Sequence, residues 1–182
     1  MSEETVIRHC APTLASIKTG SLFTSAFASR ADMNAGVISL NRRLRAKGLR
    51  VVPLRYREGV GLIYLYRPRR LQADLTGEQA AKLLREAGYS AASPEQFIRH
   101  LALRLAENAE FPHEIGLFLG YPPEDVEGFI HRRGEAKCTG IWKVYGDVEA
   151  AQRTFARYRR CTSAYLQRFW QGWSIERLTV PA

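Results

Sequence analysis

The chain has 182 residues, of which 46% are hydrophobic and 25% are charged, and its formal net charge is +9. This length and composition are ordinary for one globular domain that can bury a core without stabilisation by disulfide bonds or metal ions. No apolar run is long enough to span a bilayer, and the start MSEETVIRHC has neither the basic nor the apolar part of a signal peptide, so we predict one cytoplasmic domain over residues 1–182 and no membrane contact.

The first half of the chain predicts two helical regions and a hairpin. Ser2 can cap a short helix toward Cys10, and Pro12 either interrupts that helix or begins a second one that Gly20 closes. The second alternative places Cys10 just before a helix. Residues 33–47 have the apolar spacing of a helix that ends at Gly48. RVVPLRY and VGLIYLY, joined by Arg57-Glu58-Gly59, predict an antiparallel hairpin that Pro68 stops.

In the second half, Thr76 is expected to cap a helix that runs through Glu86, and Ser93-Pro94-Glu95 opens the next one. CTGIWKVYGD reads as a strand, and Asp147 caps a long final helix with an apolar stripe. These elements predict an α+β fold in a single compact domain, with a small, mostly antiparallel sheet packed by about five to six helices.

The basic residues do not form one cluster in the sequence, and Arg greatly outnumbers Lys. Solvated helix faces and an Arg-rich proteome explain the charge at least as well as a binding groove does. This spread argues against a nucleic-acid partner. Four side chains could still line a pocket for an anion: Lys18, Tyr66, Lys143 and Tyr145. Alternation along one strand explains the pairing of the last two without a ligand.

Several stretches carry a resemblance to a known family. They are HCAPTLASIKTGSLF, LIYLYRP, FPHEIGLFLGYPPEDVEGFI and TGIWKVYGD. Together they resemble a bacterial family known only as a domain of unknown function, numbered 3793, over nearly the whole chain. The resemblance implies a small bacterial cytoplasmic protein. It implies no catalytic residues, so the chemistry has to be argued from the residues themselves.

The first hypothesis is thiol chemistry on a small molecule or peptide, as in papain-like hydrolases or transferases. A Cys at the head of a helix has a lowered thiol pKa, and Cys10 would be the nucleophile. His113 is the candidate general base, and Glu114 or Asp125 would orient its ring. The alternative for these residues is a buried free cysteine and a histidine with an ordinary structural hydrogen bond.

The second hypothesis is a non-catalytic metal or redox-cofactor site, although the sequence does not identify a cofactor. The candidate ligands are His9, Cys10, His113, Cys138 and Cys161. No Cys-x-x-Cys pair is present, and the odd number of cysteines also argues against a disulfide framework. Cys161 and Cys138 could equally be core residues.

A third hypothesis, a DNA-binding helix-turn-helix, comes from the order of apolar and turn-forming residues in EIGLFLGYPPEDVEGFI. A recognition helix presents its first turns to the major groove, and here those turns carry Glu124, Asp125 and Glu127. The same acidic residues are favourable at an ordinary helix N-terminus. We therefore interpret this stretch as a turn followed by the start of a helix.

Overall fold

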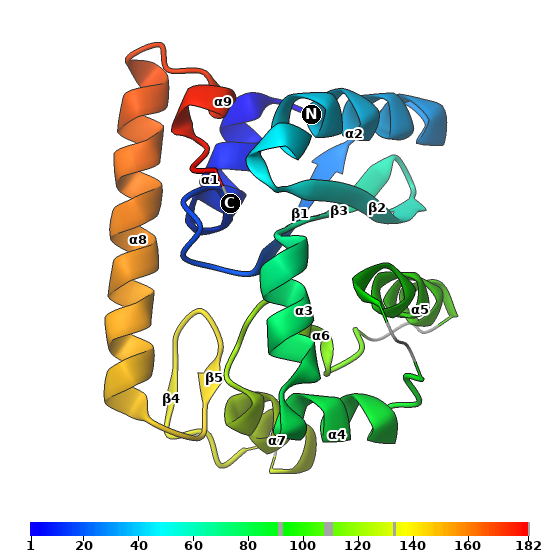
Figure 1. Ribbon diagram of the computed structural model, residues 1–182, viewed down its shortest axis with the longest axis vertical. Coiled ribbons are helices and arrows are strands. Elements are labelled where there is room, and N and C mark those ends of the chain that lie inside the picture. The colour runs from blue at the N-terminus through cyan, green and yellow to red at the C-terminus, as the bar shows by residue number, and fades with distance from the viewer. Residues whose placement is uncertain (91–92, 108–110, 133, 182) are drawn as a thin grey trace. The chain divides into compact units, whose positions relative to one another are not determined.

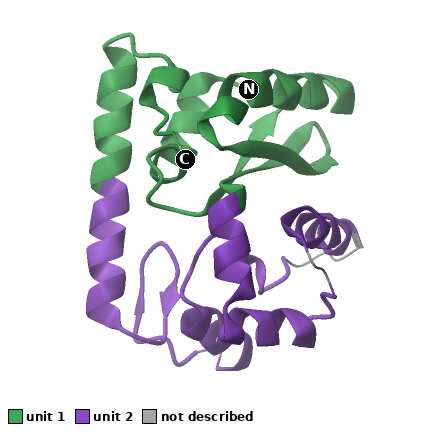
Figure 2. Ribbon diagram, in the orientation of Figure 1, with its two compact units in different colours: residues 1–68, 160–182 green, residues 69–159 purple. Residues whose placement is uncertain are grey.

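The computed structural model describes residues 1–90, 93–107, 111–132 and 134–181. Its internal contacts divide the chain into two compact units: unit 1 holds residues 1–68 and 160–182, and unit 2 holds residues 69–159 (Figure 2). Both units contain helices and antiparallel strands, which confirms the predicted α+β class. Within the described residues, no helix has the length and apolar character needed to cross a membrane.

Unit 1 contains a three-stranded antiparallel sheet in the order β1-β3-β2 (Figure 1). Its strands are β1 (Gly20–Ala26), β2 (Arg50–Arg57) and β3 (Val60–Tyr66). The predicted hairpin is confirmed. Its turn places Glu58 and Gly59 at φ angles of 52° and 78°, as the tight turn between two right-twisted strands requires. Strand β1 was not among the predicted elements, and it pairs with β3 along its whole length.

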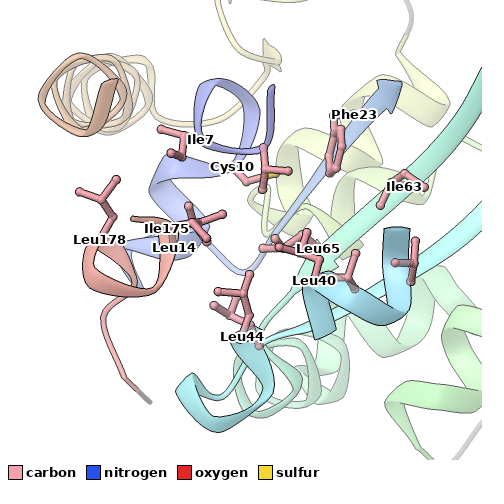
Figure 3. Close-up of a cluster of buried hydrophobic side chains, with 14 of the residues drawn as sticks. Ile7, Cys10, Leu14, Phe23, Leu40, Leu44, Ile63, Leu65, Ile175 and Leu178 are labelled. Atoms are coloured by element: carbon pink, nitrogen blue, oxygen red, sulfur yellow. The ribbon is translucent and has the colours of Figure 1, made fainter. Parts of the chain in front are cut away.

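The helices of unit 1 cover one face of this sheet. They are α1 (Glu3–Leu14), α2 (Arg30–Leu44), the 3-10 helix η1 (Arg45–Lys47), residues 160–170 of α8 (Val148–Trp170) and α9 (Ile175–Leu178). Ser2 caps α1 as predicted, since its hydroxyl accepts from the backbone N–H of Thr5. Buried side chains from these helices and from the sheet form one apolar core, part of which Figure 3 shows around Cys10, Phe23 and Leu65.

The placement of Cys10 differs from the expectation that it precedes a helix. Helix α1 continues through Pro12 and ends at Leu14, so Cys10 lies inside the helix and not at its N-terminus. Pro12 has no N–H to donate to the carbonyl of Arg8, and only Thr13 and Leu14 follow it in the helix. Of the two alternatives for Pro12, the one with a second helix that Gly20 closes is therefore wrong, because Gly20 begins β1.

Unit 2 is built mainly from helices. They are α3 (Pro68–Thr76, whose first residue belongs to unit 1), α4 (Glu78–Glu86), α5 (Pro94–Glu107), α6 (Ile115–Phe118) and α7 (Pro123–His131). Ser93 opens α5 as predicted, since its hydroxyl accepts from the N–H of Gln96. Thr76 does not cap α4. It ends α3 and donates its hydroxyl back to the carbonyl of Gln72, and Gly77 occupies the cap position.

The stretch CTGIWKVYGD forms a hairpin and not the single strand that was predicted. Its two strands are β4 (Cys138–Thr139) and β5 (Lys143–Val144), and they pair antiparallel. Asp147 then caps α8 (Val148–Trp170) as predicted, since it accepts from the N–H of Ala150. The described residues hold nine α-helices, more than the five to six expected, because α3 and the single turns α6 and α9 were not among the predicted elements.

Candidate ligand-binding site

Unit 2 contains a cavity of about 460 Å³, partly open to solvent, between α7, the β4–β5 hairpin and the segment that leads into α6. Its lining is mainly aromatic and aliphatic: Phe111, Pro112, His113, Ile115, Gly116, Tyr121, Asp125, Val126, Phe129, Ile141, Trp142 and Lys143. A volume of this size accommodates a small organic molecule.

A buried carboxylate fixes the hairpin onto α7 behind this cavity. Asp125 is 3% exposed, and its Oδ2 accepts from Nε1 of Trp142 at 2.7 Å. Its Oδ1 accepts from the backbone N–H groups of Tyr145 at 2.7 Å and Gly146 at 2.8 Å. Three donors on one carboxylate compensate its charge in the low-dielectric interior. Asp125 therefore positions the walls of the cavity, a role that the acidic start of a helix did not reveal in the sequence.

Close packing of the hairpin against α7 depends on Gly128. A Cβ atom at this position would lie 2.3 Å from Cγ of Tyr145, so any larger residue would push the hairpin away. Beside this contact, Trp142 stacks on Tyr121 with ring centroids 4.7 Å apart and meets the ring of Phe155 edge-on at 4.4 Å. The indole is thus held on two faces as well as at its N–H, which makes that wall rigid.

The basic groups of the cavity converge on one aromatic ring. The ring of His113, which is half-buried, meets the ring of Phe129 edge-on with centroids 5.2 Å apart. Nζ of Lys143 lies 5.5 Å from the centroid of Phe129, and the Lys143 side chain is exposed. Because the charge of Asp125 is compensated by its own donors, the polar groups that the described lining leaves for a ligand are the Lys143 ammonium and the His113 imidazole.

A second cavity, of about 560 Å³, shares the Phe111-Pro112-His113 wall with the first. Glu114 lies at this second cavity and is 3% exposed. One of its oxygens accepts from the Tyr89 hydroxyl at 3.0 Å and lies 2.8 Å from Nε of Arg104. Burial, together with the nearby Glu114 carboxylate, raises the pKa of Tyr89 above its ordinary value.

Cys10, the predicted nucleophile, lies in unit 1, whereas His113 and Glu114 lie in unit 2. The thiol is completely buried in the apolar core of unit 1 (Figure 3). Burial raises the pKa of Cys10 to about 12, although the nearby charge of Lys18 and a hydrogen bond with Ser21 oppose the shift. Burial likewise lowers the pKa of Lys18 to about 8, and the nearby Cys10 opposes that shift.

The other candidate metal ligands are distributed over both units. His9 is exposed on α1, and its ring lies parallel to that of Phe23 with centroids 6.2 Å apart. Cys161 is half-buried in the part of α8 that belongs to unit 1, and burial raises its pKa to about 11. Cys138 is half-buried at the start of β4. Among the residues that the structure describes, no three His, Cys, Asp or Glu side chains form a group that could hold a metal ion.

The other residues considered for an anion pocket or a helix-turn-helix also have defined places. Lys143 lines the first cavity, whereas Tyr145 packs on Gly128 behind it. Helix α6 has only four residues, and Asp125 in the first turn of α7 is buried under the hairpin. The face of the first turn of α7 that carries Asp125 is therefore covered by the hairpin of the same unit, whereas a recognition helix keeps its first turns open to the DNA groove.

Comparison with known proteins identifies one family. No curated protein and no solved structure matches the chain. A family model described as "Protein of unknown function (DUF3793)" matches residues 6–179. This match covers nearly the whole sequence, as the resemblance in the sequence predicts, and it shows that the chain belongs to the DUF3793 family.

Proposed function

We propose that the 460 Å³ cavity of unit 2 binds a small organic molecule with an aromatic or branched apolar body and one anionic group. The observation that carries this proposal is the combination of an aromatic cavity with a lysine and a histidine at one of its walls. Cavities of this volume with apolar walls and few polar groups are typical of small-molecule sites.

The apolar body of the ligand would lie against Trp142, Tyr121 and Val126. Trp142 and Tyr121 are stacked on each other, and Trp142 also donates a hydrogen bond to Asp125, so this wall is largely formed before a ligand arrives. A preformed site loses little conformational entropy on binding, and this favours affinity for a rigid ring.

The anionic group of the ligand would lie near Lys143 and His113, beside Phe129. Among the described residues that line this cavity, the other charged side chain is Asp125, which points its oxygens at Trp142 and at two backbone N–H groups. Within this described lining, a ligand carboxylate therefore meets an ammonium and an imidazole without an opposing free carboxylate, which favours anions.

A covalent thiol step is not part of this proposal. With a pKa of about 12, only about one Cys10 in 10⁵ would be a thiolate at neutral pH. An activated nucleophile needs the opposite shift, toward a lower pKa. Burial in the core of unit 1 also keeps the sulfur from solvent. These observations favour reversible binding over papain-like chemistry.

The test uses two ligands that differ only in charge, 4-phenylbutyrate and its neutral amide, 4-phenylbutanamide. Isothermal titration calorimetry on the full chain should show that the carboxylate binds more tightly, by about tenfold. Lys143→Gln should reduce this preference. The matched control is Lys82→Gln, which removes an exposed lysine of the same unit that lies outside the cavity lining.

Two results would contradict the proposal. One is equal affinity of the unmodified chain for the carboxylate and the amide, which would exclude a preference for an anionic group. The other is the absence of binding of either compound at millimolar concentration, which would remove the small-molecule site itself.

A further inference from the structure

The net positive charge of the protein comes from one of its two units. Unit 1 contains 14 Lys and Arg against 5 Asp and Glu, a formal charge of +9, which equals the charge of the whole chain. Unit 2 contains 13 Lys and Arg against 13 Asp and Glu, a formal charge of zero. The two halves of one chain thus differ in charge although they are similar in size.

This partition shows that an Arg-rich proteome does not by itself account for the net charge of unit 1. An Arg-rich proteome would raise the basic content of both units alike, and the basic content of the two units is indeed similar. Unit 2 has almost as many basic residues as unit 1, but an equal number of carboxylates balances them. The distinguishing property of unit 1 is therefore the scarcity of acidic residues, which lets its basic side chains act together.

The excess is concentrated between residues 33 and 57, where the sequence has no Asp or Glu. Its basic residues are Arg42, Arg43, Arg45, Lys47, Arg50, Arg55 and Arg57. We call this stretch, which comprises most of α2 together with η1 and β2, the α2–β2 basic segment. The side chain of Asn41 holds it together, since it donates to the carbonyl of Val51 and accepts from the N–H of the same residue.

Not every arginine of this segment is equally available. Arg43 is bound by two carboxylates, Glu3 and Glu176, and serves to join α1, α2 and α9. Arg42 and Arg45 are exposed, and their spacing of three residues places them on the same side of the helical turn. These two guanidinium groups can reach a common partner in solvent.

We propose that the α2–β2 basic segment of unit 1 binds the phosphate backbone of a nucleic acid, independently of the proposed ligand site in unit 2. Guanidinium groups suit phosphate because their donors match its oxygens in pairs. The segment offers no apolar stripe for a lipid surface. The apolar residues of α2 are buried in the core, and of this fully described helix only Ile38 is a large exposed hydrophobic residue.

The experiment measures binding of the full chain to a short duplex DNA of random sequence and to a single-stranded RNA by fluorescence anisotropy. The logarithm of the association constant should fall linearly with the logarithm of salt concentration between about 50 and 200 mM. The double variant Arg42→Gln/Arg45→Gln should weaken binding and reduce the magnitude of the duplex slope by about 1.8, since each lost phosphate contact contributes about 0.9.

The control is the double variant Arg85→Gln/Arg99→Gln, which removes two exposed arginines from unit 2 and gives the same net charge. Its affinity and salt slope should match those of the unmodified chain. Circular dichroism and thermal unfolding of both doubles exclude loss of fold as the cause. Tighter binding of either DNA or RNA would identify the natural polymer.

Three results would overturn the proposal. The first is no binding of either nucleic acid at about 50 mM salt, where phosphate contacts are strongest. The second is an equal loss in both double variants, which would assign the effect to net charge alone. The third is binding to vesicles that contain anionic phosphatidylserine without binding to nucleic acid, which would assign the surface to membranes.

Discussion

Replacing Asp125 by Ala should destabilise unit 2 more than any other single change of a carboxylate in its hairpin region. The change leaves three N–H donors without their acceptor. Two of them belong to buried residues, Trp142 and Tyr145, and the third, on half-buried Gly146, can be rehydrated. An unsatisfied buried donor costs about 1–3 kcal/mol, so the expected loss is about 4 kcal/mol.

Urea unfolding measures this loss if the signal comes from unit 2 alone. The protein has three tryptophans, of which only Trp142 lies in unit 2. Asp125→Ala and its control, Asp147→Ala, are therefore compared in a Trp170→Phe/Trp173→Phe background. With a denaturant dependence of about 2 kcal/mol/M, the midpoint should fall by about 2 M. A loss of about 4 kcal/mol is a large share of the roughly 5–15 kcal/mol that stabilises a typical domain.

Asp147→Ala is the matched control, because it also removes a carboxylate that accepts a backbone hydrogen bond in unit 2, but at an exposed helix cap. Its expected cost is about 1 kcal/mol. A cost for Asp125→Ala no larger than that of the control would refute the role of Asp125 in fixing the hairpin. It would also remove the argument that the cavity is rigid before a ligand binds.

Three further changes test the packing and the electrostatics. Gly128→Ala should destabilise the protein by about 1–3 kcal/mol in urea unfolding, because the new Cβ would lie 2.3 Å from Cγ of Tyr145. Ellman's reagent at pH 8 should label Cys10 only as fast as the protein opens, because its pKa is raised to about 12 by burial. The hydrogen bond with Arg43 lowers the pKa of Glu176 to about 2, so its stabilising effect is complete above about pH 4.5 and is lost as the pH falls toward 2. Glu176→Gln should therefore have a melting temperature that falls less than that of the unmodified chain over this range.

Each of these changes has its own control. Gly77→Ala should be tolerated, since the nearest atom to its Cβ is 3.7 Å away. Cys138 is half-buried on a strand and should react faster than Cys10, and faster labelling of Cys10 would restore the nucleophile hypothesis. Parallel melting curves of Glu176→Gln and the unmodified chain from pH 5 to about pH 2 would contradict the ion pair with Arg43.

Local signals in the sequence predicted several elements correctly. Ser2, Ser93 and Asp147 each accept a hydrogen bond from the first turn of a helix, and the Glu58-Gly59 turn joins the predicted hairpin. In each case the residue type has a direct physical reason to occupy the position. These signals act over three or four residues, so they can be recognised without knowledge of the rest of the fold.

Errors arose where tertiary contacts decided the outcome. Helix α1 continues past Pro12 because its apolar side is buried in the core of unit 1. β1 is a strand because it pairs with β3, a partner about 40 residues away along the chain, which its own short sequence does not reveal. Thr76 is a local exception, because its hydroxyl donates to the carbonyl of Gln72, four residues earlier, and so it ends one helix where it was expected to begin the next.

The candidate site was only partly visible in the sequence. His113 and Lys143 were both singled out, but for different sites, and the cavity that they share depends on the hairpin fold of residues 138–144. The structural use of Asp125 needs three donors from a segment about 20 residues further along. The charge of unit 1 was hidden as well, since the basic residues follow no pattern until the chain is divided into units.

The most direct test of the proposed ligand site is a nuclear magnetic resonance titration of the full chain with 4-phenylbutyrate. We expect shifts in the Trp142 indole N–H, which is fixed on Asp125, and in the ring protons of His113 and Phe129. The shifts should saturate together, with one dissociation constant, and should be smaller in Lys143→Gln. Shifts confined to unit 1, or no saturable shift at these three side chains, would contradict the account.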